Sequence, residues 1–184
     1  TSVYLSAKVI LGGAYNETTG LMHDELRLAG LIPLAQPYNT WSDFGYAGVE
    51  TVNASVFTAT GGNAIVDWVL VELRDAADPK VILHRRAALV QRDGDIVDTD
   101  GTSPLQFSGV GSANYFVAVR HRNHIGVMSQ SAIAFGGAPV TVDFTVSTTL
   151  NYQLSGPTGS AHAQQVWSGN KRALWPGNMS DAGN

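Results

Sequence analysis

From Ile65 to His124 the chain reads IVDWVLVELRDAADPKVILHRRAALVQRDGDIVDTDGTSPLQFSGVGSANYFVAVRHRNH. Its first nine residues, 65–73, place apolar side chains on both faces of an extended chain, which is typical of a central strand. Further runs at 80–92, 96–97, 105–107 and 115–122 predict more strands. Asp-Gly pairs at 93–94 and 100–101 predict tight turns between them, because this dipeptide tolerates positive φ. The stretch therefore predicts a β-sheet core.

The remaining chain adds strands before and after this core. Alternation of apolar and polar residues predicts strands at 3–11, 50–60, 125–135 and 140–147. One short helix is expected at about 21–28, capped by Thr19 and stopped by Gly30. The pattern predicts an all-β fold, an antiparallel β-sandwich of immunoglobulin-like or prealbumin-like type. An α/β fold is disfavoured because crossover helices are missing. We expect a domain at 1–153 and an extended tail at 154–184, docking on the same or a neighbouring subunit.

Composition limits the classes of function. Charged residues make up 14% of the 184 residues and the net charge is −4, so no basic stripe for nucleic acid is expected. The sparsely charged surface suits a secreted protein, or one whose faces are covered by copies of itself. There is no cysteine, and no apolar run has the length of a membrane span. Because the chain begins with Thr1, we expect that a leader was removed or that the sequence is a fragment.

Four carboxylates between residues 93 and 100 are the first candidate site. Asp93, Asp95, Asp98 and Asp100 supply hard oxygen ligands that could hold calcium. Their spacing is not that of an EF-hand, because Val97 stands at a ligand position. Two solvated Asp-Gly turns account for the same residues, and we favour that interpretation.

A second candidate is the polar end of the 115–122 strand, where His121, Arg122, Asn123 and His124 follow one another. These residues could serve a metal or proton-transfer site, but a continuing strand would send the two histidines to opposite faces. We therefore favour a structural role, in which the segment hydrogen-bonds to neighbouring loops. A buried carboxylate needs a cation, so we expect Asp67 to pair with Arg85, Arg86, Arg120 or Arg122.

Aromatic residues in one loop give a third candidate. Trp41, Phe44 and Tyr46 could form a platform for a sugar, although such clusters more often pack their own loop. Catalytic sequence motifs such as a nucleophile elbow, HExxH or a P-loop are missing. We expect no enzyme activity and no cofactor other than the calcium considered above.

Four segments carry a resemblance to a known family: 13–38 (GAYNETTGLMHDELRLAGLIPLAQPY), 63–75 (NAIVDWVLVELRD), 86–110 (RAALVQRDGDIVDTDGTSPLQFSGV) and 115–129 (YFVAVRHRNHIGVMS). Together they resemble a haemagglutinin-like module of large secreted proteins in type IX-secreting bacteria. In relatives a segment similar to 173–178 leads into calcium-binding, dockerin-like repeats. The middle of the chain also resembles transthyretin-like (prealbumin-like) sandwiches. The resemblance implies extracellular binding or scaffolding.

These observations predict a secreted, non-enzymatic structural or adhesive protein at the cell surface or outside the cell. Its partners would be copies of itself, in a self-assembling fibre, or surface glycans. The strand at 3–11 or the segment from Trp167 to Trp175 would cross between subunits by completing a sheet edge. The alternative function is a carbohydrate-binding module.

Overall fold

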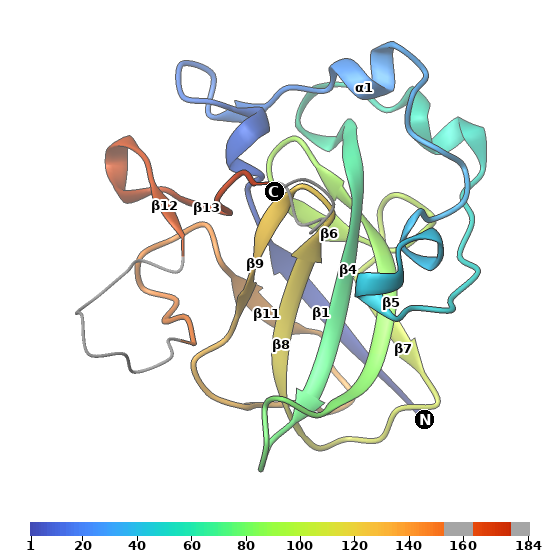
Figure 1. Cartoon of the computed structure of the whole chain (residues 1–184), viewed down its shortest axis with the longest axis vertical. Helices are drawn as coiled ribbons and strands as arrows, with labels where there is room; N and C mark the ends of the chain where they lie inside the picture. The colour runs from blue at the N-terminus through green and yellow to red at the C-terminus, as the bar shows by residue number, and fades with distance from the viewer. Residues whose placement is uncertain (153–163, 178–184) are drawn as a thin grey trace.

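The computed structural model describes residues 1–152 and 164–177, and nine strands of this part form one large sheet (Figure 1). The order is β10-β8-β4-β5-β6-β1-β11, with β7 also paired to β1 and β9 to β8. All pairs are antiparallel except β1 with β11. The strands are β1 (Ser2–Lys8), β4 (Ile65–Asp75), β5 (Ile82–Gln91), β6 (Asp95–Val97), β7 (Leu105–Ser108), β8 (Asn114–His121), β9 (His124–Met128), β10 (Ile133–Ala134) and β11 (Val140–Asp143).

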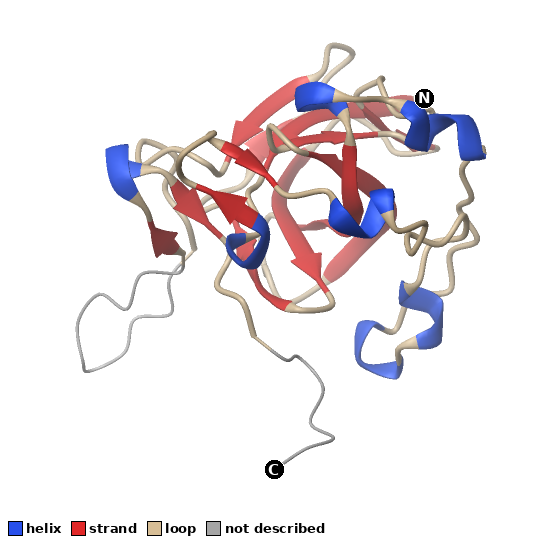
Figure 2. Ribbon diagram, turned by 90° about the horizontal axis from the view of Figure 1, so that it is seen from above, coloured by secondary structure: helices blue, strands red, loops and turns tan. Residues whose placement is uncertain are grey.

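The sheet curls around the main core without closing into a barrel (Figure 2). Buried side chains of β1, β4 and β8 belong to one apolar cluster, which includes Leu5, Val69, Val117 and Phe144. The predicted all-β, mainly antiparallel class is confirmed. The strands form one hydrogen-bonded sheet, however, where the prediction had two sheets facing each other.

The second face of β4 is covered by the irregular segment between residues 31 and 58. Tyr38 and Phe44 of this segment pack on Trp68 and Leu70 in a separate buried cluster. The hydroxyl of Tyr38 also donates to the carbonyl oxygen of Trp68 at 2.7 Å. Burial on both faces is the reason why residues 65–73 are almost uniformly apolar.

One predicted element is confirmed in part and another is wrong. The short helix expected at about 21–28 is α1 (Glu25–Leu28), a single turn before Gly30, whose φ is 67°. Residues 21–22 instead form β3 (Leu21–Met22), which pairs with β2 (Tyr15–Asn16) in a small hairpin. Thr19 lies in the hairpin turn and caps no helix, since its hydroxyl donates to the carbonyl of Asn16. The predicted strand at 50–60 is wrong, since residues 54–58 form a 3₁₀ helix; the side chain of Asn53 accepts from the amide of Ser55 and starts this turn.

Six 3₁₀ helices connect the elements of the described chain, and part of the predicted tail folds back on the sheet. The 3₁₀ helices are Gly12–Ala14, Tyr38–Thr40, Ser42–Phe44, Ala54–Thr58, Gly61–Asn63 and Ser168–Asn170. In residues 164–177, β12 (Gln165–Val166) pairs with β13 (Arg172–Ala173), and Leu174 bridges to Leu11. The rest of the predicted tail, 153–163 and 178–184, lies outside the described residues.

Candidate functional site

The candidate site is the hairpin between β8 and β9, which we call the histidine hairpin (His121–His124). The strand does not continue through these residues as expected: β8 ends at His121, Arg122 and Asn123 make the turn, and β9 begins at His124. The turn brings both histidines to the same side. Their Nδ1 atoms lie 2.9 Å apart and the rings meet edge to face. The expectation of opposite faces is therefore wrong, and the Arg-Asn pair was the sequence signal for the turn.

Hydrogen-bond partners assign the protons of the two rings. The backbone amide of Gly13 donates to Nε2 of His124 at 3.1 Å, so the proton of this ring resides on Nδ1 and is donated to Nδ1 of His121. The amide of Asn123 also donates to Nδ1 of His121, so that ring carries its proton on Nε2 and donates it to Asp67, 3.1 Å away. A continuous chain of hydrogen bonds thus runs from Gly13 to Asp67.

Asp67 ends this chain on the central strand β4. Arg122 donates to both of its carboxylate oxygens, at 2.9 and 2.7 Å, and the amide of Trp68 donates to Oδ1 at 2.8 Å. The predicted pairing of Asp67 with one of four arginines is confirmed for Arg122. A buried carboxylate is tolerated here because each oxygen accepts at least two hydrogen bonds.

The electrostatics of the hairpin favour a neutral His124 and a charged Asp67. Burial is the main reason why the pKa of His124 falls to about 4. Burial by itself would raise the pKa of Asp67. The hydrogen bond from His121, the charge of Arg122 and the hydrogen bond from the amide of Trp68 outweigh it, so the pKa of Asp67 lies below its usual value.

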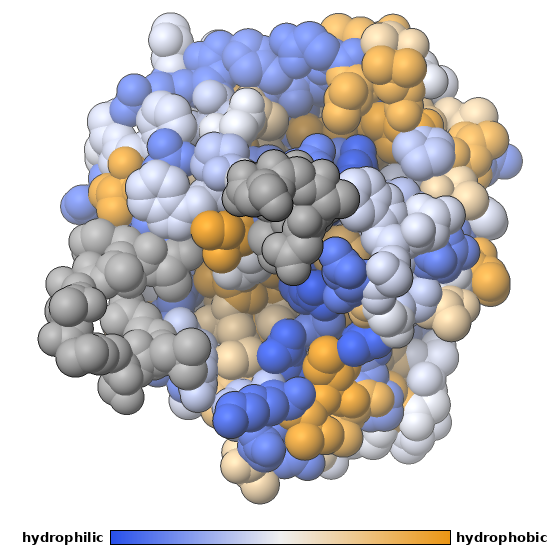
Figure 3. All heavy atoms as spheres, viewed as in Figure 1, coloured by the Kyte–Doolittle hydropathy of each residue, from blue (hydrophilic) through white to orange (hydrophobic). Residues whose placement is uncertain are grey.

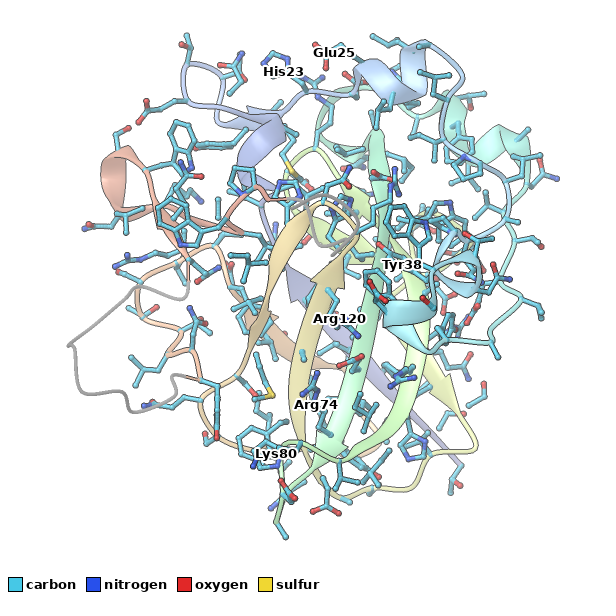
Figure 4. The ribbon with its side chains drawn as sticks, in the orientation of Figure 1. His23, Glu25, Tyr38, Arg74, Lys80 and Arg120 are labelled. Carbon is cyan, nitrogen blue, oxygen red and sulfur yellow. The ribbon has the colours of Figure 1, made fainter. Side chains whose placement is uncertain are left out.

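A pocket of about 510 Å³ opens beside the histidine hairpin. Asp67, His121 and His124 line it together with apolar side chains that include Leu11 and Leu26. At its rim Nδ1 of His23 lies 3.0 Å from a carboxylate oxygen of Glu25, and both side chains are seen next to α1 in Figure 4. Sequence reasoning missed His23 and Glu25, because the segment was expected to be one helix, in which side chains two residues apart do not face each other.

The arrangement at the hairpin is suited to holding segments together. Every ring nitrogen of His121 and His124 has a partner within the protein, so neither ring is free to take a proton from a ligand in this state. The network connects residue 13, the central strand and the hairpin, and Pro176 bridges to His124 from the C-terminal segment. Within residues 1–152 and 164–177, no three His, Asp or Glu side chains lie close enough together to hold a metal ion.

The four aspartates considered for calcium are engaged separately. Asp93 accepts from the amide of Asp95, and Asp95 pairs with Lys8 at 2.9 Å. Asp98 pairs with Arg86 at 2.5 Å, and Asp100 accepts from the amides of Thr102 and Ser103. Gly94 and Gly101 have φ of 95° and 81°, as Asp-Gly turns require. The structure therefore shows turns at these positions, and it brings the four carboxylates to no common site.

The aromatic loop packs mainly on its own protein. Phe44 is buried against Tyr38, with ring centroids 4.8 Å apart, and the guanidinium of Arg120 lies over its ring. The hydroxyl of Tyr46 bonds to Glu50 and accepts from the amide of Ala87. Trp41 is partly buried against the same cluster. Of the three proposed sugar contacts, Phe44 is thus placed in the core.

Comparisons with protein-family models, with curated proteins and with solved structures give no match to this chain. The resemblance to a haemagglutinin-like module thus rests on the sequence segments alone. None of the described helices has the length and apolar character needed to cross a membrane.

Proposed function

We propose that the chain is a secreted, non-enzymatic structural or adhesive protein whose copies assemble with one another into an extracellular fibre. The observation that carries this proposal is an apolar patch formed by α1 and the segment after it. Leu28 and Leu31 are 70% and 67% exposed, and Leu26 and Leu34 are exposed beside them in sequence. Large aliphatic side chains gathered on one surface are typical of a protein–protein contact.

Figure 3 shows the most continuous apolar surface of this view over α1 and the chain that follows it. Tyr38 and Phe44 attach the segment after α1 to the central strand β4. A rigid apolar surface loses little conformational entropy on binding. With only 14% charged residues, the chain also offers little repulsion to a second copy. The same contact repeated head to tail would give a fibre.

Two contacts expected from the sequence are occupied within the chain. β1 is hydrogen-bonded to β11 on one side and to β6 and β7 on the other, so it is not a free edge. Residues 164–177 pack on their own sheet, with Ala173 and Leu174 fully buried. The strands at the two ends of the sheet order, β10 and β11, have two and four residues, and the branch strands β7 and β9 have four and five. Short edges disfavour strand addition. We therefore place the contact between copies at the apolar patch.

Light scattering and electron microscopy of the native protein test this proposal. The wild-type protein should form assemblies, and a Leu28→Ser/Leu31→Ser variant should be monomeric with an unchanged circular dichroism spectrum. Val81→Ser/Leu83→Ser is the matched control, because both residues are exposed on the β4–β5 hairpin. A monodisperse wild-type monomer, or equal assembly of the patch variant, would contradict the proposal.

The family resemblance and the finer fold assignment belong to the same proposal. A haemagglutinin-like module at the cell surface would have the extracellular location that the sparse charge favours. Because β1, β4 and β8 share one buried cluster, we assign the curled sheet to the immunoglobulin-like or prealbumin-like sandwiches.

A second candidate function is a carbohydrate-binding module, and the observation that favours it is the partial exposure of Trp41 in the aromatic loop. A glycan array separates the two functions. Saturable binding to a neutral glycan that is lost in Trp41→Ala would favour the module over a purely structural role.

A further inference from the structure

Three arginines that are scattered in the sequence meet at one buried carboxylate. Glu72 in β4 is fully buried, and its oxygens lie 2.5 Å from Nη2 of Arg74, 3.4 Å from Nε of Arg85 and 3.3 Å from Nη1 of Arg120. The sheet register explains the meeting. Glu72 is paired directly with Arg85 of β5, and Arg120 of β8 is paired with Leu70, two residues away on the same face of β4.

The charges of this arginine cluster (Arg74, Arg85 and Arg120) do not balance. One carboxylate faces three guanidinium groups, and arginine stays protonated at every pH that a folded protein encounters. Two positive charges are therefore left over on this face of a chain whose net charge is −4. A local excess of positive charge of this kind attracts anions.

The arginines of the cluster remain partly open to solvent. Nε of Arg85 is itself buried and lies near Glu72 without an acceptor among the described residues. The side chains of Arg74, Arg85 and Arg120 remain 21%, 26% and 22% exposed. Arg120 uses Nη2 only in a long contact of 3.4 Å with the carbonyl of Asp43. A ligand with planar oxyanion groups could replace that contact.

Figure 4 shows Arg120 and Arg74 one above the other along β8 and β4, with Lys80 at the lower end of the row. Arg74 donates to the carbonyl of Pro79, the residue before Lys80. In the same orientation, Figure 3 shows hydrophilic side chains over the middle of this face. The cations thus form a row along the strands, which suits a ligand with repeated charges.

We propose that the arginine cluster binds the carboxylate groups of an acidic polysaccharide. Arginine recognises carboxylates with two parallel hydrogen bonds. The register places Met128, which is partly exposed, beside Ala118 on the face of the sheet that carries Glu72. An apolar side chain of this kind can contact the C–H groups of a sugar ring while the arginines hold its carboxylate.

Nucleic acid fits this surface less well than a polysaccharide. A phosphate backbone is bound by roughly 6–10 cationic contacts in stable complexes, whereas this row has three arginines and Lys80 on a chain of net charge −4. The site is separate from the apolar patch, so the inference goes beyond the proposed assembly and does not depend on it.

Calorimetric titration of the full chain with an oligogalacturonate tests the inference, with a neutral oligosaccharide of equal length as the reference. We expect saturable binding to the oligogalacturonate that weakens at least tenfold between 50 and 500 mM salt, and none to the neutral sugar. Arg85→Lys and Arg120→Lys keep the charges around Glu72 but lose the planar fork, and each should weaken binding about tenfold or more. Thermal unfolding of each variant checks that the fold is kept.

Arg172→Lys is the matched control, because it changes an arginine of the C-terminal segment in the same way. It should leave affinity unchanged. Asp43→Asn removes the carboxylate of the residue next to Arg120 and should leave binding intact or tighten it. Equal affinity of all variants, tighter binding of single-stranded DNA or inorganic sulfate than of the oligogalacturonate, or no binding at low salt would each overturn the inference. Because assembly is read from particle size and this site from sugar affinity, one can fail without the other.

Discussion

Nδ1 of His124 lies 2.9 Å from Nδ1 of His121, and only one of these atoms can carry a proton. The amide of Gly13, which donates to the far side of His124, decides which one it is. The chain of hydrogen bonds that results ends on a carboxylate of the central strand. The hydrogen bonds thus connect Gly13 to His124, more than a hundred positions away in the sequence. Each donor in the series points toward Asp67.

The first prediction concerns acid stability. His124 in the unfolded chain takes a proton near its ordinary pKa of 6.5, but in the folded protein only at about 4. Between these values the unfolded state binds more protons, so stability is complete above pH 6.5 and is lost as the pH falls toward 4. The lost free energy should reach at most about 3 kcal/mol. Urea unfolding at a series of pH values measures it.

A His124→Gln variant should be less stable at pH 7 and should lose most of this slope, since the titrating ring is gone. His84→Gln, at a half-buried position on β5, is the control and should keep the slope. A wild-type stability that stays constant between pH 6.5 and 4 would show that His124 is not held neutral by its surroundings.

The second prediction concerns the attachment of residues 164–177. A Cβ atom at Gly12 would lie 2.5 Å from the carbonyl oxygen of Leu174 and from Oε1 of Gln165, whereas at Gly13 the nearest atom would be 3.4 Å away. Gly12→Ala should therefore loosen the C-terminal segment and cost about 1–3 kcal/mol. Limited proteolysis and thermal unfolding would show it. Gly13→Ala should be cut no faster than the wild type, and equal behaviour of the two variants would contradict the close packing at Gly12.

The sequence predicted the elements whose pattern is set by burial. Residues 65–73 lie in β4, and the Asp-Gly pairs form turns. Both follow directly from residue type, since apolar side chains on both faces indicate a buried strand and glycine permits positive φ. At 50–60 the same reasoning failed, since the cap at Asn53 gives the backbone a local alternative to a strand. For the candidate site, the pairing of Asp67 could be predicted from the cost of an unpaired buried charge. The contact of His121 with His124 and the meeting of the three arginines could not, because both depend on the register of the strands.

The third prediction concerns calcium. Since each of the four aspartates already serves a turn or an ion pair, millimolar calcium and a chelator should give unfolding midpoints within a few degrees of each other. Calorimetry under both conditions measures this. Asp98→Asn should lower the midpoint equally with and without calcium, because it weakens the pair with Arg86. A calcium-dependent rise that Asp98→Asn abolishes would show that these carboxylates gather around an ion.

The last prediction concerns Glu72, the only carboxylate that the three arginines share within 4 Å among the described residues. Glu72→Gln keeps the shape of the side chain but leaves three guanidinium groups facing one another in a largely buried place. We expect a loss of about 3–5 kcal/mol, the usual cost of leaving buried charges without their partner. Urea unfolding at neutral pH measures the loss.

The interpretation of that loss depends on salt and on a second substitution. Repulsion between the exposed parts of the arginines is screened by ions, so 0.5 M NaCl should restore part of the stability of Glu72→Gln. Adding Arg85→Gln to Glu72→Gln removes one of the repelling charges and should be less destabilising than the sum of the two single changes. Two results would contradict this account: losses that simply add, or a cost of Glu72→Gln below about 1 kcal/mol. Either would mean that the buried carboxylate does not neutralise the arginines, and that the excess positive charge inferred for this face lies elsewhere.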